Sequence, residues 1–167
     1  MNRPQQFDAP WCTGLKLVSV VGSVVLLGAS VAILKAPAIP VWVRSVSLVA
    51  VLGTLLSCAI YTIRGYELSA HSIRVRRLLW ATTIDLKSLR SAEVDPDATR
   101  RSIRLFGNGG LFSFSGWFRN STLGIYRLCA TDPRKAVVLR FPNRAWVVSP
   151  DRPEEFIRLV RESAGIH

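Results

Sequence analysis

The sequence predicts two transmembrane helices followed by a mainly β domain that a C-terminal helix closes. Three observations predict this class. The chain has 167 residues, 49% of them hydrophobic, and its mean hydropathy of +0.27 is high for a soluble domain. The apolar excess lies in the first 65 residues. Beyond residue 65 the pattern changes to the alternation of half-buried strands.

Two uncharged runs are long enough to cross a bilayer. Leu17–Leu34 holds 18 residues and Ser45–Ile63 holds 19, so that as helices they reach roughly 27–29 Å. Neither run has the polar stripe of a helix in a soluble core, which is the first alternative. The second alternative is a signal peptide cleaved after Ala38, although the apolar run is longer than such a peptide needs. We therefore expect two spans.

The segment 35–44 between the runs contains Pro37 and Pro40 and indicates a tight hairpin loop. It holds two basic residues, whereas six stand near the other ends of the runs: Arg3, Lys16, Arg64, Arg74, Arg76 and Arg77. This bias places the loop outside and both termini in the cytoplasm. The expected organisation is an N-terminal cytoplasmic tail at 1–14, a transmembrane hairpin at 15–64 and a cytoplasmic domain at 65–167.

The cysteines and the charge agree with a cytoplasmic domain. Cys12, Cys58 and Cys129 form no CxxC pair, which indicates reduced thiols. Residues 66–167 hold 17 Lys and Arg against 10 Asp and Glu, a balance that attracts the domain to an anionic leaflet. Nucleic acid is the rival partner, but no recognition motif accompanies the charge, so we expect no nucleic-acid binding.

About seven short strands are expected in the domain. In Ser72–Leu79, Ile73 and Val75 alternate with arginines, as in a half-buried strand. Further strand-like runs are Thr82–Leu86, Ser91–Val94, Arg101–Phe106, Leu111–Phe118, Thr122–Ala130, Ala136–Phe141 and Ala145–Val148. This spacing is typical of a sandwich or a small barrel.

A helix closes the chain. The segment 149–154 resembles a helix start, with Asp151 as the expected N-cap. Phe156, Leu159 and Val160 then mark one apolar face. We expect this face to cover an open end of the sheet.

A pattern of glycine, aromatic and proline positions in segments 109–141 and 146–160 carries a family resemblance. Its members are Gly116, Phe118, Leu123, Gly124, Tyr126, Ala130, Thr131, Asp132, Val137, Val138, Leu139, Ser149, Pro150, Pro153 and Phe156. The pattern is similar to the bacterial PH-like (pleckstrin-homology) domains of small membrane proteins. The resemblance covers about residues 66–165. It implies a PH-like fold in a protein of the bacterial inner membrane, and it implies little about activity because this family is largely uncharacterised.

No enzyme, metal or cofactor site is expected. His71 lies in a turn and His167 at the terminus, and spacing gives neither a catalytic partner. The acids occur where turns and the helix start already explain them: Asp95, Asp97, Glu154 and Glu155. The GNGG segment at 107–110 indicates a flexible connection between strands, because no helix follows it as in a phosphate loop.

Two surfaces are candidates for binding. The first is a contact loop formed by Leu111, Phe112, Trp117, Phe118 and Arg119. These aromatic side chains either plug the barrel mouth or form a contact surface for a partner. The second is a basic face formed by Arg74, Arg76, Arg77, Arg100 and Arg101. Its guanidinium groups either contact lipid headgroups or are simply solvated.

The expected function is a membrane-anchored, non-enzymatic binding or scaffold protein. Its PH-like recognition domain lies at the cytoplasmic membrane face, and protein–protein interaction is the first hypothesis. One alternative is anionic lipid headgroup binding by the basic face. The other is a structural subunit of a membrane complex, in which helices pack through Gly22 and Gly28 or Ser23 and Ser30.

Overall fold

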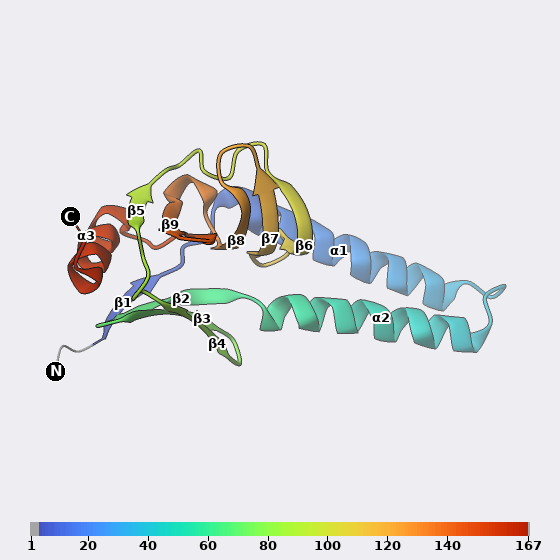
Figure 1. The fold of residues 1–167 in the computed structure, drawn as a ribbon. Helices are drawn as coiled ribbons and strands as arrows, with labels where there is room; N and C mark the ends of the chain where they lie inside the picture. The colour runs from blue at the N-terminus through green and yellow to red at the C-terminus, as the bar shows by residue number, and fades with distance from the viewer. Residues whose placement is uncertain (1–3, 167) are drawn as a thin grey trace.

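A helical hairpin and a β sandwich make up the chain. The computed structural model describes residues 4–166. Helices α1 (Thr13–Lys35) and α2 (Val41–Ile60) lie side by side and project from the sandwich (Figure 1). Both are long and apolar enough to cross a membrane, and only 11% and 0% of their apolar stretches are buried. They are therefore not core helices of the sandwich.

The loop between the helices is closed by one side chain. Arg44 donates hydrogen bonds to the carbonyl oxygens of Ile39 at 2.8 Å, Pro37 at 3.1 Å and Leu34 at 3.3 Å. Carbonyls at a helix C-terminus lack partners within the helix, and a nearby cation satisfies them. One of the two basic residues of the hairpin thus has a structural role.

Two sheets form the sandwich. The first has the order β1 (Gln5–Asp8), β2 (Ile63–Ser69), β3 (Ser72–Arg77) and β4 (Ala81–Asp85). The second has the order β5 (Ser91–Val94), β9 (Val137–Phe141), β10 (Arg144–Val148), β8 (Gly124–Ala130), β7 (Phe114–Asn120) and β6 (Ile103–Gly109). Only β10 and β8 pair in parallel. A short 3-10 helix, Pro133–Lys135, precedes β9, and α3 (Pro153–Ala164) ends the fold.

The main core lies between the two sheets. It combines Tyr66, Ile73 and Val75 of the first sheet with Leu139 and Val148 of the second. The buried face of α3 completes it with Phe156, Ile157 and Val160. This helix covers the end of the sandwich farthest from α1 and α2 (Figure 1). The end beside α2 has no such cover, and this difference positions the site described below.

The expected fold class is confirmed. Two long apolar helices precede a mainly β domain of two sheets and a C-terminal helix. Nine strands follow α2 within the described residues, rather than about seven. One reason is that α2 ends at Ile60, so the last part of the uncharged run belongs to β2. Ile63 is fully buried in the sandwich, and hydropathy alone does not separate a buried strand from a helix.

The segment expected as a tail, 1–14, contributes an edge strand. β1 pairs antiparallel with β2, and Phe7 lies edge-on to Phe156 with ring centroids 5.0 Å apart. The N–H of Asp151 donates to the carbonyl of Asp8 at 2.9 Å. Both ends of the helical hairpin are therefore fastened to one domain. Cleavage after Ala38 would remove a strand and a core side chain.

Candidate functional site

The uncovered end of the sandwich holds a cavity of about 510 Å³, which we call the mouth cavity. It opens between the two sheets, and Ser57 and Cys58 of the last turn of α2 form one wall. Its aromatic lining residues are Tyr61, Trp80, Phe106 and Trp117, and its basic ones are Arg77, Arg104 and Arg127. No carboxylate is among the lining residues. The cavity is thus apolar and positively charged, a combination suited to a ligand with an anionic group.

Arg77 enters the cavity wall because β3 alternates strictly. Ile73, Val75 and Arg77 point inward, while Arg74 and Arg76 point outward. The Arg77 side chain is 6% exposed. It donates to the carbonyl of Tyr61 at 2.7 Å and the hydroxyl of Ser115 at 2.9 Å, and its guanidinium lies 4.9 Å from the Trp80 ring centroid. It therefore joins the C-terminus of α2 to both sheets.

The charge of Arg77 has no counter-ion among the described residues. It forms no ion pair there, and its Nε has no hydrogen-bond partner. A buried cation without a paired anion is costly, and helix carbonyls offset only part of that cost. An anionic ligand in the mouth cavity would supply the missing partner.

Arg127 presents a second guanidinium from β8. Two indole rings hold it, with centroids 4.8 Å away for Trp146 and 5.8 Å away for Trp117. Stacking fixes the plane of a guanidinium and leaves its N–H edge free for an oxyanion such as phosphate. Neither Arg127 nor Arg104 forms an ion pair within residues 4–166.

Bare backbone forms one edge of the cavity. Gly107 of β6 pairs with Gly116 of β7, at φ values of 111° and 152°. A Cβ on Gly116 would lie 2.1 Å from the carbonyl oxygen of Phe106. Only glycine therefore permits this close approach of the strands. The ladder also shifts register between Arg104 and Phe106, a bulge that redirects the side chains of β6.

The thiol behind the cavity is not activated. Cys129 is fully buried, and burial raises its pKa even though Arg77 and Arg127 oppose the shift. The thiol is therefore neutral near pH 7 and is no nucleophile. No group of three or more His, Cys, Asp or Glu side chains is placed to hold a metal ion in the part of the chain that the structure describes.

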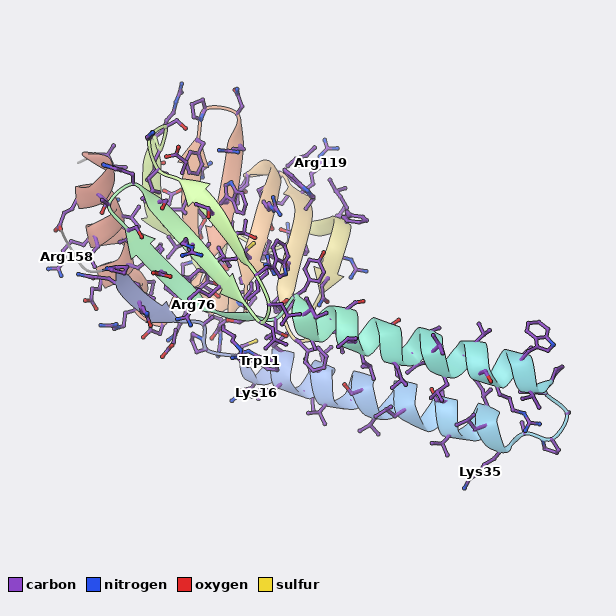
Figure 2. The ribbon with its side chains drawn as sticks, turned by 90° about the horizontal axis from the view of Figure 1, so that it is seen from below. Trp11, Lys16, Lys35, Arg76, Arg119 and Arg158 are labelled. Atoms are coloured by element: carbon purple, nitrogen blue, oxygen red, sulfur yellow. The ribbon has the colours of Figure 1, made fainter. Side chains whose placement is uncertain are left out.

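The five residues of the expected contact loop do not form one loop. Leu111 packs on Gly22 of α1, because a Cβ added to Gly22 would lie 3.3 Å from Cδ1 of Leu111. Phe112 donates its N–H to Ser19 Oγ at 2.9 Å. The turn between β6 and β7 thus docks on α1. Phe118 is buried on the far face of the second sheet, and Trp117 lines the cavity from the middle of β7. Arg119 is exposed toward the last residue of β7 (Figure 2), and Trp117 keeps 42% of its surface exposed.

The five arginines of the expected basic face also separate. Arg74 and Arg76 are both exposed on the outer face of the first sheet, and Figure 2 shows Arg76 there. Arg100 and Arg101 lie in the segment 95–102, which covers the far face of the second sheet through Ala98. Arg77 requires a correction, because strand alternation turns it into the interior instead of onto that face. No single face carries all five.

Several motif residues have structural roles. Ser149 Oγ accepts from the N–H groups of Thr131 at 2.8 Å and Asp132 at 3.2 Å. Thr131 Oγ1 in turn donates to the carbonyl of Pro10 at 2.9 Å, just before α1. These buried polar groups fasten the start of α1 to the domain. They lie outside the lining of the mouth cavity.

Comparison with known families decides what this domain is. The family model described as Bacterial PH domain matches residues 64–164. The chain belongs to the bacterial PH domain family. No curated protein and no solved structure matches it. The matched range begins beside β2 and ends with α3, so this bacterial PH domain is joined to a β1 strand and a helical hairpin that precede the match.

Sequence reasoning assigned Arg77 and Trp117 to other surfaces and missed the remaining residues of the cavity. Strict alternation from Ile73 would have placed Arg77 inward. In β8 the same rule places Arg127 on the opposite face from Tyr126 and Leu128, which are buried on the far face of the second sheet. No local sequence pattern predicts that Tyr61 and Trp80 lie beside each other. Their rings are 5.4 Å apart because α2 and the turn after β3 meet at Arg77.

Proposed function

We propose that this chain is a membrane-anchored, non-enzymatic binding protein whose bacterial PH domain binds an anionic phospholipid headgroup. In this proposal α1 and α2 span the bacterial inner membrane, and the domain and both termini are cytoplasmic. The mouth cavity is the headgroup site. Arg77 and Arg127 contact the phosphate, and the aromatic lining contacts the glycerol and the first acyl carbons.

One observation carries the proposal. The cavity places a buried, unpaired guanidinium and a stacked one in an apolar lining that contains no carboxylate. Guanidinium groups bind phosphate through paired, charge-assisted hydrogen bonds. In a low-dielectric site such bonds are stronger than at an open surface.

The position of the cavity supports a lipid source for the anion. Its wall includes Ser57, Cys58 and Tyr61, at the end of a helix long enough to cross a membrane. If α2 spans the bilayer, its last turn lies at headgroup depth, where Tyr and Trp are enriched. A phospholipid beside α2 can then enter the cavity without leaving the bilayer.

The topology has two supports. More basic residues flank the domain ends of the helices than their hairpin, which favours a cytoplasmic domain. In addition, β1 and β2 are partners in one sheet, so the segments before α1 and after α2 lie on the same side of any membrane that the helices cross.

Lipid binding replaces protein binding as the first hypothesis. Leu111, Phe112 and Phe118 of the expected contact loop are occupied within the chain. Trp117 is a cavity residue, and Arg119 alone is a small surface for a protein partner.

The test measures lipid affinity with matched arginine variants. Full-length protein in neutral detergent is titrated with short-chain phosphatidylglycerol or phosphatidylcholine, and bound lipid is counted by native mass spectrometry. Arg127→Met is expected to weaken phosphatidylglycerol binding roughly 10- to 100-fold, because one charge-assisted phosphate contact is lost. Arg158→Met removes the same charge from α3, at the opposite end of the domain (Figure 2), and should leave affinity unchanged.

A second titration, with a water-soluble phosphate, distinguishes a lipid headgroup from a free phosphate as the ligand. Glycerol phosphate without acyl chains should bind far more weakly than the lipid. Equal affinity of both variants for phosphatidylglycerol, or equal binding of the two lipids, would refute the proposal.

A further inference from the structure

The free edge of the second sheet is apolar. β6 pairs only with β7, so its other edge has no partner strand among residues 4–166. Three large side chains of β6 are exposed: Ile103 by 70%, Leu105 by 51% and Phe106 by 77%. A long apolar edge in water promotes association, and soluble domains usually protect such edges with charges, Pro or a covering segment. We therefore expect this edge to contact something other than water.

A second apolar group lies across the mouth cavity. The turn between β3 and β4 exposes Leu78, Leu79 and Trp80. Trp80 and Phe106 both line the cavity, so the two groups stand on either side of its opening. We call these six residues of β6 and the turn the apolar rim.

The rim faces the direction in which the helices leave the domain. In the second sheet the strand order ends with β6, and in both views β6 is the strand on the side of the helices (Figures 1 and 2). The contacts of Arg77 with Tyr61 and of Leu111 with Gly22 attach the domain to both helices. These contacts fix the position of the rim along the length of the two helices.

The parts of the helices that extend beyond the domain are short for a membrane span. Beyond Gly22, where the β6–β7 turn contacts α1, α1 continues for 13 residues to Lys35, or about 20 Å. From Val41 to Ser57, where α2 meets the mouth cavity, there are 17 residues, or about 25 Å. The hydrocarbon layer is about 30 Å thick. With the domain outside the bilayer the hairpin is several ångströms too short, and this mismatch is removed if the near side of the domain sinks into the bilayer.

We propose that the apolar rim inserts into the interfacial layer of the membrane and holds the domain in one orientation on the bilayer. Aliphatic and aromatic side chains at this depth contact the upper acyl chains, and the free N–H groups of β6 donate to lipid oxygens and water. A second copy of the chain is disfavoured as the occupant, because it would have to stand between the domain and the bilayer to which the helices attach it. This inference uses the membrane anchoring proposed above and does not require a ligand in the mouth cavity.

The test places a photo-crosslinking amino acid at single positions of the full-length chain in native membranes. With p-benzoyl-phenylalanine in place of Ile103, a rim residue that does not line the mouth cavity, irradiation should give adducts whose mass increase is that of a phospholipid. The same replacement at Arg158, on α3, should give none. Replacement at Val49, which is exposed on α2, reports whether that helix lies in lipid.

The three positions separate the possible failures. Lipid adducts at Val49 without any at Ile103 would overturn the inserted rim and leave the anchoring intact. Absence of lipid adducts at both positions would overturn the anchoring itself. An Ile103 adduct with a second copy or with another protein would identify the edge as a protein interface and would also overturn the inference.

Discussion

The Tyr66 hydroxyl links the two sheets through two buried hydrogen bonds, and its removal should destabilise the domain. Tyr66 of β2 is fully buried. Its O–H donates to the carbonyl of Cys129 in β8 at 2.7 Å and accepts from the N–H of Ser149, after β10, at 3.0 Å. Tyr66→Phe leaves both groups without this partner. Each orphaned buried group costs about 1–3 kcal/mol, so we expect the two together to lower the free energy of unfolding by about 2–6 kcal/mol.

The assay is thermal unfolding of the full-length protein in neutral detergent, followed by near-ultraviolet circular dichroism. A loss of this size lowers Tm by roughly 4–24 °C for a chain of this length. Tyr61→Phe is the matched control, because it keeps the ring beside Trp80 and removes no hydrogen bond that the described structure contains. Equal Tm values for the two variants would refute the reasoning.

The same residue gives a pH dependence with a definite sign. Burial raises the pKa of Tyr66 above its ordinary value of 10.0, with the hydrogen bond to Ser149 opposing the shift. Below pH 10 the phenol is neutral in both states, and its stabilising contribution is complete. As the pH rises further the unfolded phenol ionises first, so stability falls. Between pH 10 and 11.5 the wild-type Tm should therefore fall more steeply than that of Tyr66→Phe.

Three other predictions concern the cavity wall and the helices. Gly116→Ala should lower the free energy of unfolding by about 2–5 kcal/mol and increase hydrogen exchange in β6, because the added Cβ would meet the Phe106 carbonyl. In the control variant Gly124→Ala the added Cβ meets open space at a φ of 65°, so the loss should be only about 1 kcal/mol. Equal losses in the two variants would contradict this geometry. Arg77→Met should raise hydrogen exchange at residues 57–62 more than Arg76→Met does, because only Arg77 contacts Tyr61; similar exchange in both would remove its proposed role at the α2 terminus. Alkaline phosphatase fused at Pro40 should be active and the same enzyme fused at the C-terminus inactive, whereas the reverse would invert the proposed topology.

Much of the fold follows from local patterns. Hydropathy located both helices, although it placed their starts at Leu17 and Ser45 instead of Thr13 and Val41. β1 was missed because QQFD is a short polar segment with one apolar side chain. That segment becomes a strand through its pairing with β2 and the burial of Phe7, both of which are tertiary effects.

The candidate site was less accessible to sequence reasoning. Charge alone groups these arginines together. Their environments depend on which face of the strand each one occupies, and the neighbours Arg76 and Arg77 occupy opposite faces of β3. Trp117 and Phe118 are neighbours in β7 and therefore face opposite sides of the sheet. The cavity itself joins residues of α2, β3 and β6–β8, whose approach depends on how the hairpin docks on the sandwich. No local periodicity encodes that docking.

The central claim is that the mouth cavity holds a membrane lipid through its phosphate. The most direct measurement is the identity and amount of lipid that remains with the full-length protein after extraction from native membranes in mild detergent and a delipidating wash. About one anionic phospholipid per chain should remain on the wild type and be lost from the Arg77→Met/Arg127→Met double variant, provided that both elute as the same folded species. A lipid-free wild-type chain, or the same lipid retained by the double variant, would contradict the account.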